Sequence, residues 1–145
     1  ADRSDDMQRM AGYRDALTSA GVDFAPDLVV RGTGRIGGGE RALPVLLSLA
    51  RPPTAVFCYN DMTAIGLMHA AREAGLSLPD DLAIVGFDDN PNAQHQNPPL
   101  TTVRLPAKDL GRRAGELLFD LILHQVEPGR QVTLETELMI RNSTA

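Results

Sequence analysis

Hydrophobic residues form two short runs in the middle of the chain, and each run ends in acids or amides. Residues 55–59 are followed by Asn60, and residues 82–87 are followed by Asp88. Between the runs, apolar residues recur at helical spacing until Gly75. The pattern predicts a strand, a helix and a second strand. Because such a crossover joins parallel strands, Asn60 and Asp88 are expected at one carboxyl edge of a sheet, where open α/β sheets bind ligands.

The residues before these runs predict two further helices and a strand. The expected elements are a helix at about 4–20, a strand at 28–30, a flexible glycine-rich loop at 32–39 and a helix at 42–49. Ser4 or Asp5 can cap the first helix, and Gly21 stands just past its end. Pro44 is tolerated only in the first turn of the second helix or at a kink.

The residues after Asp89 predict a loop, a strand, a long helix and a closing strand. These elements are expected at 90–99, 101–105, about 106–124 and 134–141. In the closing strand Leu134, Thr136, Leu138 and Ile140 alternate with Glu135, Glu137, Met139 and Arg141. That period of two predicts a strand in which the second set faces solvent.

The composition narrows the possible functions. The 145 residues carry 14 Lys and Arg against 19 Asp and Glu, a formal net charge of -5, so no basic face for nucleic acid is expected. The single cysteine, Cys58, lies in a strand run and is interpreted as a buried, inert thiol. There is no long apolar stretch and the first residues are polar, so we expect a cytoplasmic protein without membrane contact.

Several motifs occur in a fixed order along the chain. They are Pro53-Thr-Ala-Val-Phe-Cys-Tyr-Asn-Asp61, Gly66, Gly75-Leu-Ser-Leu-Pro79, Val85-Gly-Phe-Asp-Asp89, Pro98-Pro-Leu-Thr-Thr-Val103, Leu110-Gly111 with Ala114, and Arg141-Asn-Ser-Thr144. In this order and spacing the chain resembles the carboxyl-terminal half of the effector-binding core of the LacI/GalR family of bacterial transcription regulators. The resemblance implies an α/β, periplasmic-binding-protein-like I fold with a doubly wound parallel sheet, present here in part and mostly as the C-terminal subdomain.

The resemblance also implies a domain organisation. Residues 1–105 would be the C-terminal effector subdomain without its first strand and helix, 106–131 a helix belonging to the N-terminal subdomain, and 132–145 the returning terminal strand. The DNA-reading head, the hinge and most of the first subdomain would lie outside the chain. An apolar helix face without its partner predicts a product that oligomerises, aggregates or needs a complementing segment.

By resemblance, the effector contacts are Arg9, Asn60 and Asp88, with Asp5 as a further hydroxyl contact. A carboxylate accepts from two hydroxyls, a guanidinium donates in a fork and an amide does both, which suits a sugar or a nucleoside-like ligand. The alternative for the strand-end residues Asn60 and Asp88 is a helix cap or an Asx turn, and for Asp5 a helix cap. Asp61 is interpreted as an N-cap. Gly34 stands where many relatives have an aromatic residue, so a stacking platform for the ligand is missing.

Two histidines raise the question of a metal. His69 and His95 have no neighbouring Cys or carboxylate at ligand spacing, so no metal and no cofactor are expected. By resemblance, the exposed face carrying Ile65 and His69, with the loop at His95, would form a homodimer interface. The alternative is that this face is ordinary solvated surface or core.

The function implied is ligand sensing within a repressor-type transcriptional regulator, not catalysis. Its partners would be a sugar-like or nucleoside-like effector, a second copy of the chain, and operator DNA through the missing head. One alternative is a periplasmic sugar-binding protein of a transporter. Another is a magnesium-dependent phosphoacceptor domain using Asp61, Asp88 and Asp89, against which stands the absence of any lysine near these acids, Lys108 being the only one.

Overall fold

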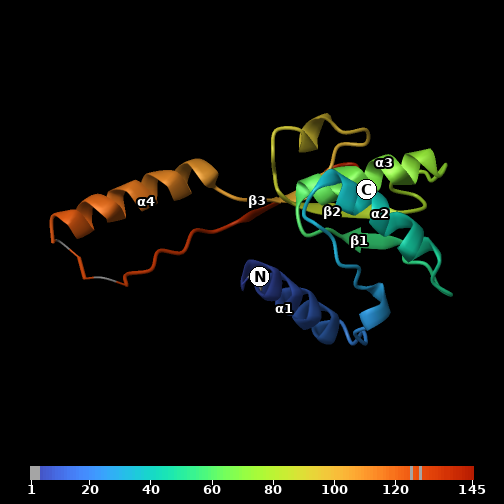
Figure 1. Cartoon of the computed structure of the whole chain (residues 1–145), viewed down its shortest axis with the longest axis horizontal. Helices are drawn as coiled ribbons and strands as arrows, with labels where there is room; N and C mark the ends of the chain where they lie inside the picture. The colour runs from blue at the N-terminus through green and yellow to red at the C-terminus, as the bar shows by residue number, and fades with distance from the viewer. Residues whose placement is uncertain (1–3, 125, 128) are drawn as a thin grey trace.

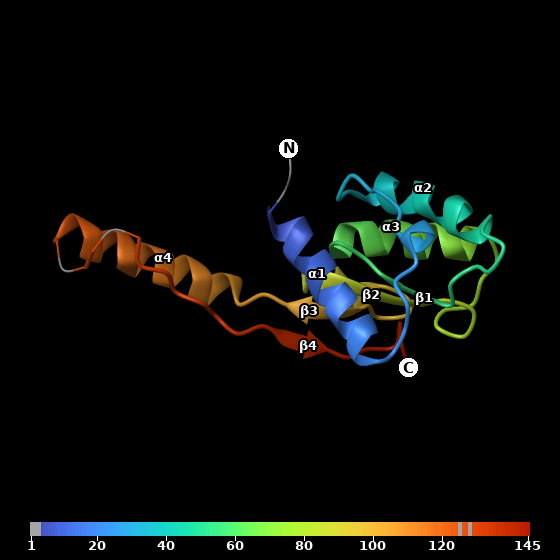
Figure 2. The ribbon, with the colours of Figure 1, turned by 90° about the horizontal axis from the view of Figure 1, so that it is seen from below.

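The computed structural model describes residues 4–124, 126–127 and 129–145, with side chains described from Met7 onward. Its elements in chain order are α1 (Ser4–Ser19), the 3-10 helix η1 (Pro26–Leu28), α2 (Ile36–Leu47), β1 (Ala55–Phe57), α3 (Asp61–Glu73), β2 (Ala83–Asp88), the 3-10 helix η2 (Ala93–His95), β3 (Thr101–Arg104), α4 (Ala107–Ile122) and β4 (Glu137–Met139) (Figure 1). A rounded body carries one long arm, formed by α4 and the chain that returns from it (Figures 1 and 2).

The strands of the described chain form one sheet in the order β1-β2-β3-β4. β1 pairs with β2 and β2 with β3 in parallel, whereas β4 is antiparallel to β3. The predicted strand–helix–strand crossover is confirmed, because α3 connects the parallel strands β1 and β2. The carboxyl ends of β1 and β2 therefore meet at one edge of the sheet, as expected.

The core lies between α2, α3 and one face of the sheet. It contains Leu43 and Leu46 of α2, residues 64–68 and Ala71 of α3, and Leu82, Ile84, Ala93 and Leu100 around the strands. Cys58 joins this core as predicted, and burial raises the pKa of its thiol to about 12. Because side chains alternate along β2, Val85 and Phe87 face the opposite side from Ile84, toward α1.

Helix α2 begins before the position that the sequence predicted. The three glycines at 37–39 are helical, so the expected flexible loop at this position is wrong. Close packing requires Gly39: a Cβ there would overlap the backbone of Thr63 in α3, and a Cβ on Gly66 would overlap the carbonyl of Ile36 in α2. The two helices approach each other at a distance that only glycine permits. Pro44 lies inside α2.

The strand predicted at 28–30 is also wrong. Pro26 to Leu28 form a 3-10 turn, and Val29 and Val30 belong to no strand. In the described chain β1 is the edge strand of the sheet, and no strand pairs with its outer side. Without a partner for its backbone groups, a β-branched run does not form a ladder.

The closing strand is shorter than predicted, and its predicted apolar face is not buried. Only Glu137 to Met139 pair with β3. Leu138 and Ile140 are exposed, 55% and 71%, whereas Met139 is half-buried. No helix or strand of the described chain covers the face on which Leu138 and Ile140 lie. The apolar residues of this strand therefore form an exposed surface instead of part of the core.

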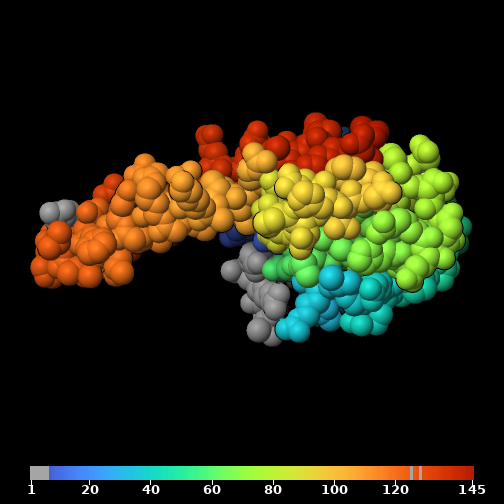
Figure 3. Space-filling model, turned by 90° about the horizontal axis from the view of Figure 1, so that it is seen from above, coloured from blue at the N-terminus to red at the C-terminus, as the bar shows by residue number. Residues whose placement is uncertain are grey.

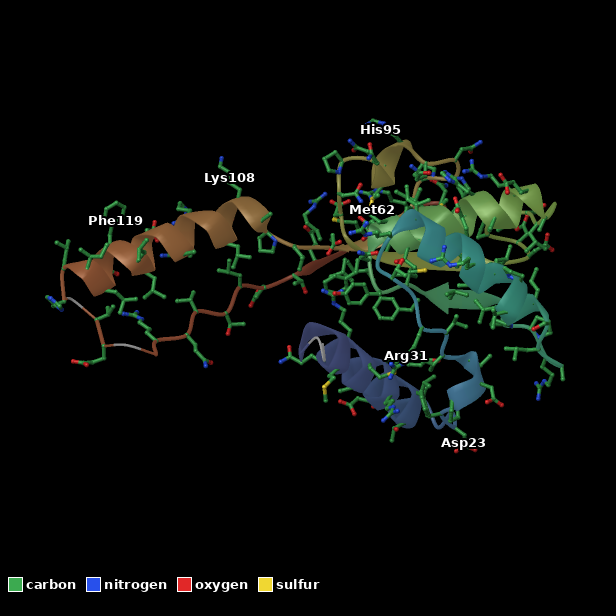
Figure 4. All side chains as sticks on the ribbon, viewed as in Figure 1. Asp23, Arg31, Met62, His95, Lys108 and Phe119 are labelled. Carbon is green, nitrogen blue, oxygen red and sulfur yellow. The ribbon has the colours of Figure 1, made fainter. Side chains whose placement is uncertain are left out.

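Helix α4 confirms the predicted helix at about 106–124, but it extends away from the body and does not pack on it (Figure 3). None of its residues is buried. Its large exposed apolar side chains are Leu110, Leu118, Phe119 and Ile122. Phe119 projects away from the returning chain (Figure 4). Among the described residues, none of the helices has both the length and the hydropathy to cross a membrane.

Candidate ligand-binding site

Arg9 of α1 reaches the carboxyl edge of the sheet. Its Nη1 donates a hydrogen bond to the carbonyl oxygen of Tyr59 at 2.6 Å. Its guanidinium carbon lies 4.5 Å from the centroid of the Tyr59 ring and 4.1 Å from that of Phe87. Cation–π contacts with both rings therefore hold the Arg9 guanidinium at the carboxyl edge of β1 and β2.

Asn60 caps α3. Its amide oxygen accepts hydrogen bonds from the backbone N–H of Thr63 at 2.9 Å and from the hydroxyl of Thr63 at 2.8 Å. Its amide nitrogen donates to the carbonyl of Gly34 at 3.0 Å. The cap alternative for Asn60 is thus what the structure contains, and one amide N–H remains for a further acceptor. Gly34 uses its backbone, with a positive φ of 70°, to reach this amide.

Asp88 closes β2 beside Arg9. Burial and the nearby carboxyl group of Asp61 raise the pKa of Asp88, and the positive charge of Arg9 opposes this rise. The φ of Asp88 is 120° and that of Asp89 is 53°, conformations that side-chain-bearing residues seldom adopt. Such strain is maintained where the surrounding structure requires a specific side-chain direction, which is common at ligand sites.

Asp61 is buried and belongs to the framework of the site. Its carboxylate accepts from the Thr102 hydroxyl at 2.5 Å and from the Asn90 backbone N–H at 2.7 Å. Burial raises the pKa of Asp61, while these hydrogen bonds oppose the rise. The interpretation of Asp61 as the N-cap is wrong, because the cap position is Asn60 and Asp61 is the first residue of α3.

Asp89 lies behind the site in an ion-pair cluster. Its carboxylate accepts from Arg104 Nε at 2.7 Å and from Arg141 Nη2 at 2.7 Å. Burial alone would raise the pKa of Asp89, but the hydrogen bonds from both arginines lower it below its ordinary value. Asp89 is therefore the one member of the Asp61, Asp88 and Asp89 set whose charge is well compensated in the described structure.

The other residues singled out from the sequence lie apart from this edge. The side chain of Asp5 lies outside the described residues. Ile65 is buried at 4% exposure in the α3 core, so its expected place on an exposed face is wrong. His69 is half-buried and His95 exposed, and Figure 4 shows His95 on the opposite side of the body from α1. Within the described residues, no group of three His, Cys, Asp or Glu has the arrangement of a metal site.

The contacts of the three acids disfavour a phosphoacceptor centre. Asp61 is held by Thr102 and Asn90, and Asp89 by two arginines, so the oxygens of both carboxylates already have partners within the protein and are not directed to a metal ion. Lys108 is exposed on α4, along the arm (Figure 4). The geometry instead brings a cationic fork, a carboxylate and an amide together, a donor and acceptor set for a polar, uncharged molecule.

Sequence reasoning missed the framework residues Thr102, Arg104 and Ser143. The hydroxyl of Ser143 donates to the Ile84 carbonyl at 2.6 Å and accepts from the Thr101 backbone N–H at 2.8 Å, which joins the end of the chain to β2 and β3. The only sequence signal was their position inside the Thr-Thr-Val-Arg and Arg-Asn-Ser-Thr motifs. The two motifs contact each other although they lie far apart in the sequence, and the spacing of residues along the chain does not reveal such contacts.

Comparison with known proteins identifies one protein family and several transcription regulators as relatives of this chain. The model of the family described as periplasmic binding protein-like domain matches residues 1–144. The chain is 40% identical over 136 residues to the HTH-type transcriptional repressor CytR of Escherichia coli K12, covering 94% of this chain and 40% of the repressor. It is 36% identical over 137 residues to the HTH-type transcriptional regulator CelR of Thermobifida fusca, with 94% and 40% covered.

Solved structures share the fold as well. The structure of the CelR–cellobiose complex matches with a TM-score of 0.89 at 36% identity, over 94% of this chain and 42% of that chain. A LacI-type transcription regulator from Bifidobacterium animalis subsp. lactis matches with a TM-score of 0.92 at 30% identity, over 100% and 52%. The chain spans about 40% of the length of the curated relatives described above.

Proposed function

Because the chain belongs to the periplasmic binding protein-like domain family, within the LacI/GalR group of transcription regulators, we propose that it senses the effector of a repressor-type DNA-binding regulator. The effector is a small sugar or a nucleoside-like molecule. Support for a sugar comes from relatives whose structures are described with cellobiose and with sucrose. The relatives are regulators and not enzymes, which agrees with a binding role.

The observation that carries the proposal is the meeting of Arg9 and Asp88 at the carboxyl edge of β1 and β2. The Arg9 guanidinium is held by two aromatic rings and the Tyr59 carbonyl, so its orientation is set before a ligand arrives. The Asp88 carboxylate accepts from two ligand hydroxyls, Arg9 donates to a ligand oxygen, and Asn60 supplies one amide N–H. Prior orientation of these groups reduces the entropic cost of binding.

We further propose that α4 packs on a second subdomain and that the effector acts by closing the two subdomains on each other. The apolar face of α4, which the body does not cover, supports this docking. The effector then acts only through its preference for the closed state, which changes how the DNA-reading heads of a dimer are spaced. The operator DNA is bound by a DNA-reading head that is not part of residues 1–145, and the regulator acts in the cytoplasm. His69 and His95 lie at the interface with a second copy of the chain.

The test is effector binding by the full-length regulator that contains this chain. Isothermal titration calorimetry with ribose, cellobiose, sucrose, adenosine and cytidine identifies the probe that binds. Asp88→Asn is expected to weaken that probe by about 10- to 100-fold, since a hydrogen bond to a charged group contributes about 1.5–3 kcal/mol. Circular dichroism checks that the fold of the variant is retained.

The matched control is Asp80→Asn, which changes an exposed aspartate in the turn before β2 in the same chemical way. It is expected to leave the affinity unchanged. Equal affinities of wild type and Asp88→Asn for the bound probe would contradict the proposed site.

A further inference from the structure

A single carboxylate holds both chain segments that connect the body to the arm. β3 leads out to α4, and the chain returns from α4 through β4 (Figures 1 and 2). Arg104 is the last residue of β3, and Arg141 follows β4. Asp89 accepts from both, at 2.7 Å each, one with each carboxylate oxygen. The Asp89 side chain is 10% exposed and that of Arg141 16%, so solvent screens this pair weakly, whereas the Arg104 side chain is 45% exposed.

The two arginines differ in how else they are held. Arg141 is fixed to the body, because its Nη1 donates to the Leu100 carbonyl at 2.8 Å and its backbone N–H donates to the Thr101 hydroxyl at 2.8 Å. Arg104 has, besides Asp89, a 3.4 Å contact with the exposed Glu137 of β4. The orientation of Arg104, at the point where β3 leaves the sheet, is therefore set mainly by Asp89.

Asp89 is also joined directly to the candidate ligand site. Asp88 precedes it, and both residues have positive φ values, 120° and 53°. The backbone N–H of Asp89 donates to the Thr102 hydroxyl at 3.3 Å, and that hydroxyl donates to Asp61. Asp88 and Asp89 share one planar peptide, so a change in the φ or ψ of Asp88 also displaces Asp89. It thereby shifts the carboxylate that holds both crossing segments.

We propose that Asp89 is a positioning residue that transmits effector binding at Asp88 to the crossing strands β3 and β4, and through them to α4, by its paired contacts with Arg104 and Arg141. The inference rests on the proposed function of the chain as an effector sensor. The two adjacent acids then have different roles. Asp88 binds the effector, and Asp89 couples effector binding to the orientation of α4 and the chain that returns from it.

The test uses the full-length regulator, its operator DNA and one probe. The probe is whichever of ribose, cellobiose, sucrose, adenosine and cytidine raises the melting temperature of the wild type most. Three quantities are measured: probe affinity, operator affinity without probe, and operator affinity with saturating probe. Asp89→Asn is expected to keep the probe affinity within a few-fold, while the probe-induced change in operator affinity falls from the usual coupling of about 5- to 150-fold to about 1- to 2-fold.

A second variant and a control separate transmission from folding. Arg104→Gln removes one contact of the pair at a side chain that is 45% exposed, and an intermediate loss of coupling is expected. Glu137→Gln removes the other, exposed partner of Arg104 and is expected to leave all three quantities unchanged.

Two results overturn the inference while the proposed function stands. One is full coupling in Asp89→Asn. The other is a loss of probe affinity in Asp89→Asn as large as in Asp88→Asn, because Asp89 would then belong to the binding site itself. If no probe binds the wild type or alters its operator affinity, the proposed function fails and the inference fails with it.

Discussion

The aspartates that follow β1 and β2 differ in what surrounds their carboxyl groups. Asp61 is enclosed, and burial raises its pKa despite hydrogen bonds from Thr102 and Asn90. Burial also raises the pKa of Asp88, against the charge of Arg9. Asp89 is half-buried, which would raise its pKa, but hydrogen bonds from two arginines lower it. Three identical side chains within one small region are therefore a framework residue, a ligand candidate and an ion-pair centre.

The lowered pKa of Asp89 predicts how its contribution to stability depends on pH. A carboxyl group whose pKa is lower in the folded state stabilises the fold above its unfolded pKa, near 3.8, and loses this contribution as the pH falls through the folded value. Asp89→Asn is expected to reduce the free energy of unfolding by about 1.5–3 kcal/mol at neutral pH and by progressively less below about pH 4.

Urea unfolding of the wild type and the Asp89→Asn variant at a series of pH values measures this difference. Asp61 and Asp88, whose raised pKa values make stability fall as the pH rises, are present in both proteins, but the Asp89 charge contributes to the raised pKa of Asp61, so part of the measured difference comes from Asp61. A difference that stays constant down to strong acid would show that the ionised form of Asp89 contributes nothing.

Among the elements, the contact between α2 and α3 is the closest in the body. Gly66→Ala is expected to destabilise the fold by about 2 kcal/mol or more, because the added methyl group meets the backbone carbonyl of Ile36, which cannot move without shifting α2. Thermal unfolding followed by circular dichroism measures the change.

Gly111→Ala in α4 is the matched control for this substitution. A Cβ there meets no atom within 4 Å, and alanine favours a helix by about 0.5–1 kcal/mol over glycine. The control is expected to raise stability slightly. Equal effects of the two alanine substitutions would contradict a packing role for Gly66.

The elements that sequence patterns predicted well are those whose partners are close along the chain. The segment from Ala55 to Asp88 gave a strand, a helix and a strand, because burial on one side imposes a period that short windows reveal. The run of glycines at 37–39 predicts a loop, because the α3 backbone that requires Gly39 lies far along the chain. Residues 28–30 have strand propensity but no partner strand in the described chain.

The candidate site was predictable in part for the same reason. Strand ends identified Asn60 and Asp88, whereas the family resemblance was needed for Arg9, which lies far from them in sequence. The structure brings Arg9 beside Asp88. Spacing could not show that Arg104 and Arg141 meet at Asp89, because side-chain contacts between distant strands depend on sheet register.

At the scale of the whole molecule, the exposed apolar side chains of α4 predict self-association of the isolated chain. Phe119 is 68% and Ile122 61% exposed, and exposed apolar patches of this kind bind other protein surfaces. Analytical ultracentrifugation is expected to show dimers or larger species, and the double substitution Phe119→Glu with Ile122→Glu is expected to shift the population toward monomer.

Lys108→Glu changes the charge of the same helix away from these apolar side chains and is the control for this experiment. It is expected to leave the association unchanged. A monomeric wild-type chain at concentrations of tens of micromolar, about the range in which exposed patches associate, would contradict the prediction.

The register between β3 and β4 has a consequence for protein engineering. Arg104 pairs with Glu137, so the two positions at which the chain leaves and re-enters the sheet are neighbours across an antiparallel ladder. Two such positions can be joined by an Asn-Gly type I′ turn. Everything from Leu105 to Thr136 is therefore an excursion that a tight hairpin can replace. The remaining body would be a more compact protein in which the carboxyl edge of β1 and β2 is retained.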